Sequence, residues 1–432
     1  MDGASGQQTT RQKWSSNETE VLVVDQSENN IEESAIFDEE PEGVSSNQLP
    51  IKNMSDKSVF GICFVPLQLK SDRNIIWVNN KPSSIFYCRP IKFQFTKEEK
   101  NFVKEQYKYY TDLLEQVESW NFYIGEIQFT VSFDLKCTMI DGKICNWLTD
   151  QDSTQSCNIC RVTPSKINDL KFIQTLNIQE NYYKFGLSTL HAWIKSLEYI
   201  LHISYKLDIR ENDSRAVKKQ KIVERKAIVQ KVLKEKLQLS VDVVKQGFGT
   251  TNTGKIFYKL IFFTYTEKFY YYLGNVSREF FSHAQVAAEC TGVSHELIKR
   301  LYTILQVFTC GRKPRDVSKF ENYALKTAQL FIEKYNWYKK PPSVHKMLIH
   351  GGKIIRSFEL PIGWYSEEAQ EANNKIFRKA RANFSRMTDR LHTNQDTFKY
   401  LLVNSDPFLA SLRKTAEKRH KPLTAEAENL LK

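Results

Sequence analysis

The sequence predicts an α/β fold in which a sheet layer is followed by a long helical region. With 432 residues the chain is too long for one simple core, so we expect two or three lobes. Patterns over residues 57–140 run strand, strand, helix, strand, which is typical of an α/β layer. From about residue 155 the patterns become helical.

The strands of the predicted layer are rich in β-branched and aromatic residues. Residues 57–70 and 89–96 have this composition, and a Pro stands at the entry of the second. Residues 97–119 repeat apolar side chains at three- and four-residue steps, which predicts an amphipathic helix. Residues 122–140 predict one or two further strands that end at Asp141-Gly142.

The helical region begins with a long apolar-faced segment. We predict helices over 187–209, 214–239, 294–309 and 319–336, with Ser294 and Ser318 as caps of the last two. Residues 214–239 are rich in Lys and Arg, and a solvated face is the plain explanation. The longest apolar run, Ile256–Leu273, is interrupted by Lys259, Glu267 and Lys268, so we do not expect it to span a membrane.

Charge is distributed unevenly along the chain. The whole chain has a net charge of +12. Residues 1–14 contribute +1, and residues 15–45 hold ten acids and no Lys or Arg. Residues 46–432 therefore carry a net charge of +21. We expect the acidic segment, 15–50, to be a disordered loop. The basic remainder favours a polyanionic partner, nucleic acid first, although a Lys-rich surface without such a partner is equally compatible.

Cysteine usage points to a reducing compartment. Eight Cys in 432 residues do not make a disulfide framework, and no signal peptide precedes them, so an intracellular protein is expected.

Two Cys and two His have spacings that suit one zinc ion. Cys157-x2-Cys160 can chelate a metal, and the same spacing serves redox pairs. His345-x4-His350 falls in the range of zinc-binding His pairs, but the gap from Cys160 is far too long for a zinc finger. If the four meet, they connect two distant segments; the alternative is two thiols and two unrelated imidazoles.

Acidic residues occur at three places where chemistry is possible. Asp141 is predicted at the rim of the sheet, and Asp2 lies at the extreme N-terminus. Glu367, Glu368 and Glu371 stand at a predicted helix start, where helix capping alone would explain them. The same helix then turns basic at Lys375, Arg378, Lys379 and Arg381, so carboxylates would lie beside a cationic surface.

Several blocks together resemble one protein family. These are MDGASGQ, RPIKFQF, MIDGKICNWLTDQDSTQSCNIC, FGLSTLHAWIKSLEYILHISYKLDIR, GTTNTG, SVHKMLIHGGKII and LPIGWYSEEAQEANNK. In this order they resemble the Transib-type DNA transposases, relatives of the catalytic core of the V(D)J recombinase. The resemblance spans most of the chain.

The resemblance implies an RNase H-like catalytic fold with a triad of acids and a large helical, zinc-stapled insertion. By position, Asp2, Asp141 and Glu371 match the three catalytic, Mg²⁺- or Mn²⁺-binding acids. Cys157, Cys160, His345 and His350 match the structural zinc ligands, and Lys375, Arg378, Lys379 and Arg381 would contact DNA.

The implied organisation divides the chain into five regions. Residues 1–14 carry the first acid, 15–50 form the acidic loop, 51–150 the RNase H-like sheet, 151–350 the zinc-binding insertion, and 351–432 the third-acid helix with the basic C-terminal region. The implied function is a nuclear endonuclease and strand transferase. It would cleave and join double-stranded DNA at terminal inverted repeats and act as a homodimer, and the need for an accessory protein stays open.

Two departures from the family keep other functions open. The chain starts at Met1-Asp2, so the first strand of the catalytic sheet is expected to be missing, and residues 255–273 look like an inserted segment. A truncated or domesticated, catalytically inactive DNA-binding derivative is the main alternative. A zinc-stapled protein-interaction module without DNA binding is the other.

Overall fold

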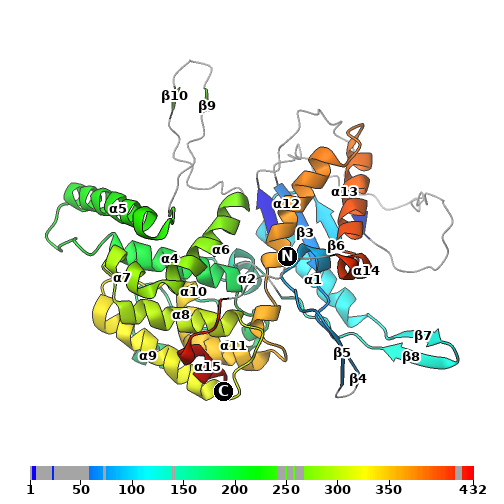
Figure 1. Ribbon diagram of the computed structural model, residues 1–432, viewed down its shortest axis with the longest axis horizontal. Helices are drawn as coiled ribbons and strands as arrows, with labels where there is room; N and C mark the ends of the chain where they lie inside the picture. Colours follow the sequence, from blue (N-terminus) through cyan, green and yellow to red (C-terminus); the bar gives the residue numbers. More distant parts are fainter. Residues whose placement is uncertain are drawn as a thin grey trace.

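The chain folds as a mixed, mostly helical protein with small antiparallel sheets. The computed structural model describes residues 2–5, 22–23, 58–71, 74–138, 140, 142–241, 249–250, 256–257, 267–413 and 421–432. Two groups of elements are visible: a cluster of helices, and a second group built around a sheet (Figure 1).

The main sheet is antiparallel with the strand order β1-β3-β6-β2. Its strands are β1 (Asp2–Ser5), β2 (Leu22–Val23), β3 (Ser58–Phe64) and β6 (Arg89–Gln94). The predicted strands over 57–70 and 89–96 are thereby found. The strand expected to be missing would precede Asp2, and that expectation stays a prediction. β1 begins at Asp2 and pairs with β3, which sets Asp2 opposite Gly61.

Two hairpins extend from the sheet region. They are β4 (Gln68–Ser71) with β5 (Asn74–Val78), and β7 (Trp120–Ile124) with β8 (Ile127–Val131). The strand pattern predicted over 122–140 therefore ends early, since residues 132–138 form no strand.

Helices cover both faces of the sheet. On one face α1 (Lys100–Glu115) and α2 (Gly142–Leu148) pack through Val103 and Ile144 against Phe60 and Ile62. On the other, α12 (Glu368–Asn383) and α13 (Arg390–Asn404) pack near Val59, and α14 (Pro407–Leu412) follows and contacts α13. Residues 59 and 60 point to opposite sides of a strand, which is why the two helical layers are separate.

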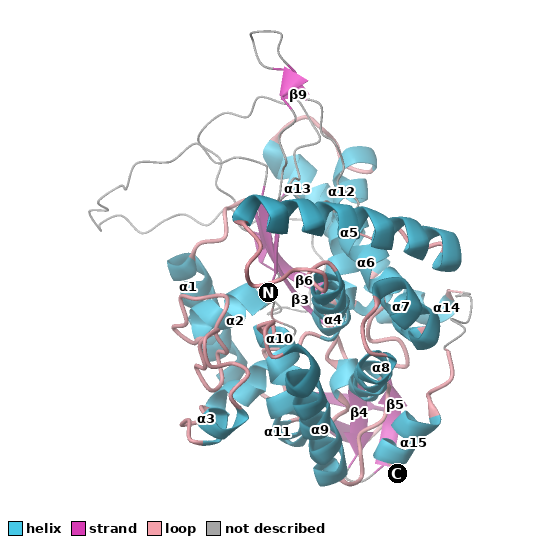
Figure 2. Ribbon diagram, turned by 90° about the vertical axis from the view of Figure 1, so that its left-hand side faces the viewer, coloured by secondary structure: helices cyan, strands magenta, loops and turns pink. Residues whose placement is uncertain are grey.

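The larger hydrophobic core lies in the helical cluster. Its helices include α3 (Leu170–Gln174), α4 (Thr189–Ser204), α5 (Arg215–Leu237), α6 (Glu267–Ser282), α7 (Ala284–Thr291), α8 (His295–Thr309), α9 (Val317–Tyr335), α10 (Pro342–His345), α11 (Gly351–Ser357) and α15 (Ala425–Leu431). Short helical turns are η1 (Ile85–Tyr87), η2 (Glu180–Phe185), η3 (Lys346–His350) and η4 (Ile362–Trp364). α5 runs along the outside of the cluster (Figures 1 and 2).

The predicted helices are all present, with small differences at their ends. Ser294 does precede α8, but its side chain makes no capping hydrogen bond. The prediction of Ser318 as a cap is wrong, because Asp316 accepts hydrogen bonds from the backbone N–H groups of Ser318 and Lys319. The last helix, α15, returns to the helical cluster, where Glu426 accepts a hydrogen bond from Tyr323 at 2.8 Å.

Two predicted segments fall largely outside the described residues. Of the acidic loop over 15–50, only β2 is described, and of residues 255–273 only β10 (Ile256–Phe257) and the start of α6. β10 pairs with β9 (Gly249–Thr250). Among the described residues no helix is long and apolar enough to cross a membrane.

Candidate metal centre and the acidic helix start

A tight turn brings Cys157 and Cys160 together. The N–H of Arg161 donates to the carbonyl of Cys157 at 2.8 Å, and the N–H of Cys157 donates to the carbonyl of Val162 at 3.2 Å. Arg161 has φ +57°, so the chain reverses within this turn. Both thiols are buried as a result.

A π-helical turn aligns His345 and His350. In a regular α-helix, residues five apart point about 140° away from one another. Here α10 ends at His345 and the next five residues, η3, form a π-helix, whose wider turn relates residues i and i+5. Gly351 follows at once, and a Cβ there would come within 2.6 Å of the Phe308 ring, so a glycine is needed for this close packing.

The four side chains form one buried group. One donor atom of each of Cys157, Cys160, His345 and His350 lies within 4.8 Å of the others. The Sγ of Cys160 lies 3.3 Å from Nε2 of His345, and the two imidazole rings are 5.2 Å apart. All four residues are at most 2% exposed.

The polar atoms of this group fit a zinc ion. Nδ1 of His345 and Nε2 of His350 are buried and have no hydrogen-bond partner among the described residues, an arrangement that is costly without a ligand or water. Two thiols and two imidazoles within one coordination sphere are a typical structural zinc set. The group is therefore consistent with a structural zinc site that joins segments 185 residues apart.

Electrostatics favour the zinc-ligand forms of Cys157 and His345, whereas the hydrogen bond to Cys157 and burial raise the pKa of the Cys160 thiol. Burial raises the pKa of the Cys157 thiol, but hydrogen bonds from Cys160, His345 and His350 outweigh it, so its pKa lies well below the usual value. Burial lowers the pKa of His345 below 6.5, which favours the neutral imidazole. Thiolate and neutral imidazole are the ligand forms of these residues.

A buried lysine lies close enough to influence this group. Lys340 is buried, its Nζ has no hydrogen-bond partner among the described residues, and it lies 5.2 Å from the centre of the Phe331 ring. Burial lowers the pKa of Lys340 to about 8, and its charge contributes to the lowered pKa of His345. No pattern in the sequence indicates that this lysine is buried.

The three glutamates at the start of α12 differ in their surroundings. Glu367 is buried, and its Oε1 accepts hydrogen bonds from the N–H of Leu190 at 3.1 Å and of His191 at 3.3 Å. The hydroxyl of Ser188 donates to the same oxygen. Glu367 therefore caps α4 from outside that helix, and a carboxylate is favoured at a helix N-terminus.

The other two glutamates face different partners. Glu368 forms an ion pair with Arg278 of α6. Glu371 lies one turn further along α12, where its N–H donates to the carbonyl of Glu367 at 3.0 Å, and its side chain is half-buried. Of the three, Glu367 and Glu368 thus hold α12 to the helical cluster.

Gly61 of β3 marks the place where segments carrying predicted acids meet. Asp2, in β1, is paired with Gly61. A Cβ on Gly61 would lie 3.3 Å from Nε2 of Gln370, the residue before Glu371. The side chain of Asp2 and all of Asp141 lie outside the described residues, but Ile140 is buried in the cluster that contains Phe60.

The four residues predicted to contact DNA differ in their exposure to solvent. Lys375 and Lys379 are exposed on α12, whereas Arg378 is half-buried. Arg381 is only 2% exposed, and its guanidinium lies 4.4 Å from the centre of the Phe95 ring. In this structure Arg381 is thus part of the packing between α12 and the sheet and does not lie on the surface.

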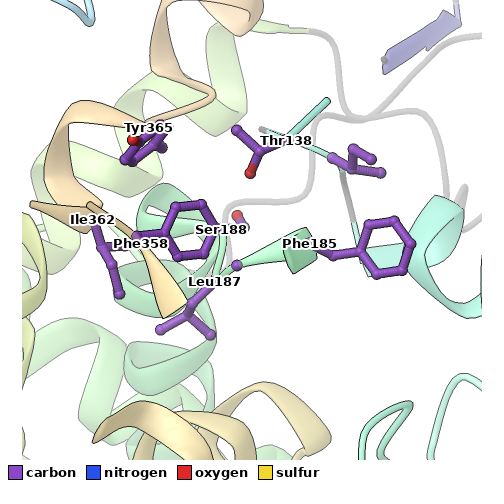
Figure 3. Close-up of a pocket in the computed structure, with 9 residues that line it drawn as sticks. Thr138, Phe185, Leu187, Ser188, Phe358, Ile362 and Tyr365 are labelled. Atoms are coloured by element: carbon purple, nitrogen blue, oxygen red, sulfur yellow. The ribbon is translucent and has the colours of Figure 1, made fainter. Parts of the chain in front are cut away.

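A small pocket lies between the segment before Asp141 and the start of α4. It is lined by residues from three parts of the chain, including Thr138, Ile140, Ser188, Phe358 and Tyr365 (Figure 3). It has room for about one water molecule. The lining is largely apolar apart from hydroxyl groups, so we assign it no catalytic role.

The chain matches no model of a known protein family and no curated protein sequence.

Proposed function

We propose that this protein is a DDE-type transposase or recombinase. It would cleave and join DNA at the ends of a mobile element, using Asp2, Asp141 and Glu371 as its acidic triad. The main support for this proposal is that two acid-bearing segments come together at Gly61. Asp2 of β1 is paired with Gly61, and Gln370, the residue before Glu371, lies beside it. Acids from distant segments would then act together.

The sheet supports an RNase H-like interpretation. β1, β3 and β6 are antiparallel neighbours and α1 follows β6 directly, before the segment that leads to Asp141. In the chain, three strands and one helix that packs on them thus precede the second acid, Asp141. The helical cluster, with its Cys and His group, then lies between the second and third acids in the chain.

The chemistry requires clustered carboxylates. Divalent ions held by such carboxylates neutralise charge on the attacking and leaving oxygens of a phosphodiester, and Mg²⁺ prefers carboxylates, water and phosphate oxygens. In this proposal Glu371 supplies one ligand from α12, while Lys375 and Lys379 on the same helix bind the DNA backbone. Glu367 and Glu368 fix the direction of that helix.

The zinc group has a separate, structural role in the proposal. Four protein ligands leave no open position for a substrate, so the ion would connect the 157–160 turn to η3 without acting on DNA. Because α11 and η4 follow η3 and lead directly into α12, this connection would help to position Glu371.

Nicking of a supercoiled plasmid that carries the element ends tests the proposal. We expect nicking in Mg²⁺ or Mn²⁺ by the wild-type chain and none by Asp141→Asn, with equal DNA binding by both. DNA binding without nicking by either protein would favour the inactive DNA-binding derivative. No binding at physiological salt would favour the protein-interaction module.

A further inference from the structure

Two cysteines outside the metal group lie on the same side of the main sheet. Cys63 of β3 is paired with Pro90 of β6, and Cys88 stands two residues before Pro90. Side chains two residues apart in extended chain point to the same side, and directly paired residues do so as well. Cys63 and Cys88 are therefore diagonal neighbours on one side of the ladder, and neither is in a disulfide.

Both thiols face the same turn of α12. Nδ2 of Asn373 donates to Sγ of Cys63 at 3.7 Å, and Sγ of Cys88 donates to Oε1 of Gln370 at 3.7 Å. Residues three apart are neighbours on a helix surface, so the two sulfurs contact one small area of α12. Gln370 is also the residue whose Nε2 lies beside Gly61. The pair thus belongs to the contact that places α12 on the sheet.

The two thiols differ in their access to solvent. Cys88 is only 1% exposed, whereas Cys63 is half-buried. A hydrogen bond with the Cys63 sulfur and burial raise the pKa of the Cys88 thiol well above its usual value, so Cys88 stays protonated. An accessible cysteine beside a second one that can attack it is the arrangement of redox-sensing pairs. Cys63 is the member that a small oxidant reaches.

We propose that Cys63 and Cys88 are a redox-sensitive pair that closes to a disulfide and thereby loosens the contact of α12 with the sheet. Hydrogen peroxide first converts the Cys63 thiol to a sulfenic acid and releases one water. The Cys88 sulfur then attacks the Cys63 sulfur: the S–S bond forms, the S–O bond breaks, and the hydroxyl leaves with the Cys88 proton as a second water. In total, two electrons pass from the two sulfurs to the peroxide.

The disulfide has a direct consequence for α12. Once Cys88 has lost its proton, its sulfur has nothing to donate to Oε1 of Gln370, so this hydrogen bond is lost. Gln370 and Asn373 stand on either side of Glu371 in the chain, so the turn that carries Glu371 loses one of its contacts with the sheet. Only the meaning of this change for catalysis rests on the proposed function. The closing of the bond rests on the contacts of the two thiols.

Peptide mass spectrometry of the folded full chain after hydrogen peroxide treatment tests the bond. We expect a peptide pair joined through Cys63 and Cys88 and lighter by two hydrogens, and dithiothreitol should restore both thiols. Cys63→Ser should lack this pair. Cys310→Ser is the matched control and should keep it, because Cys310 is also half-buried but its thiol donates to the carbonyls of Val307 and Arg312.

Hydrogen exchange of the oxidised chain, without DNA or divalent ions, tests the consequence. Amides of residues 371–375 should exchange about two- to fivefold faster than in the reduced chain, the scale of one lost hydrogen bond. Peroxide should leave this exchange unchanged in Cys63→Ser. Because no nicking is measured, failure of the proposed function leaves the result intact, and the reverse.

The two wild-type measurements need no variant, so a Cys63→Ser chain that fails to fold leaves the test in place. A folded wild type that keeps both thiols in peroxide would overturn the proposal. So would a Cys63–Cys88 link that leaves the exchange of residues 371–375 unchanged.

Discussion

Glu367 provides the most specific stability prediction. Replacing it by Ala removes the acceptor of the Leu190 N–H and of the Ser188 hydroxyl, whereas the His191 N–H keeps the Ser188 oxygen as an acceptor at 3.2 Å. Each buried donor left without a partner costs about 1–3 kcal/mol. We therefore expect Glu367→Ala to lower the free energy of unfolding by about 3 kcal/mol, and Glu367→Gln, which keeps one acceptor oxygen, by about 1 kcal/mol.

The neighbouring Glu368 is the matched control. Its ion pair with Arg278 is partly exposed, and such pairs contribute about 0–1 kcal/mol, so Glu368→Ala should lie within that range. Urea unfolding followed by circular dichroism measures all three variants. Equal stabilities for Glu367→Ala and Glu368→Ala would refute the capping role.

The same contacts predict a pH dependence. Burial alone raises the pKa of Glu367, but the hydrogen bond and charge of His191, with the hydroxyl of Ser188, bring it below 4.5. A carboxylate whose pKa is lower in the folded than in the unfolded chain stabilises the fold fully at pH values above its unfolded-state pKa. This contribution is lost as the pH falls through its folded-state pKa. The stability difference between wild type and Glu367→Ala should therefore shrink below about pH 4.5. A difference that stays constant there would contradict the assignment.

Three further predictions concern the metal group, Lys340 and DNA. Cys157→Ser should lose bound zinc, which mass spectrometry of metals measures, and the helical cluster should unfold, because structural zinc contributes about 10–16 kcal/mol in small domains. Cys290 is a buried thiol outside the group, so Cys290→Ser should keep the zinc and the folded helical cluster. Lys340→Met should raise the free energy of unfolding at pH 7 by about 3 kcal/mol, which corresponds to the lowering of the Lys340 pKa from 10.5 to about 8. This gain should vanish above pH 10.5, where the lysine is neutral in both the folded and the unfolded chain. Lys339→Met, at an exposed position, is the control and should change the free energy of unfolding little. Lys375→Ala/Lys379→Ala should weaken DNA binding and reduce the slope of log K against log salt by about two, unlike the exposed α9 pair Lys326→Ala/Lys334→Ala.

Periodicity and composition were sufficient for the main elements of the fold. Apolar residues at three- and four-residue steps mark α1, and the β-branched runs mark β3 and β6. The Cys and His spacings also led to the buried group. These features are local, and local patterns are what a sequence displays directly.

Features that depend on tertiary contact were not visible in the sequence. Glu367 resembled an ordinary helix-start acid, yet its partner is the N-terminus of α4, distant in the chain. Arg381 belonged to a basic run by composition, but the sheet covers it. The π-helical turn between His345 and His350 has no simple sequence signal, because its extra residue is fixed by packing around Gly351.

The most direct test of the central claim separates Glu371 from the neighbouring Glu368. Nicking of a supercoiled plasmid with the element ends would be compared for Glu371→Gln and Glu368→Gln in Mg²⁺, with bound DNA measured in parallel. The account predicts that Glu371→Gln binds DNA normally and does not nick, while Glu368→Gln retains nicking. Nicking by Glu371→Gln at the wild-type rate would contradict the assignment of the third acid.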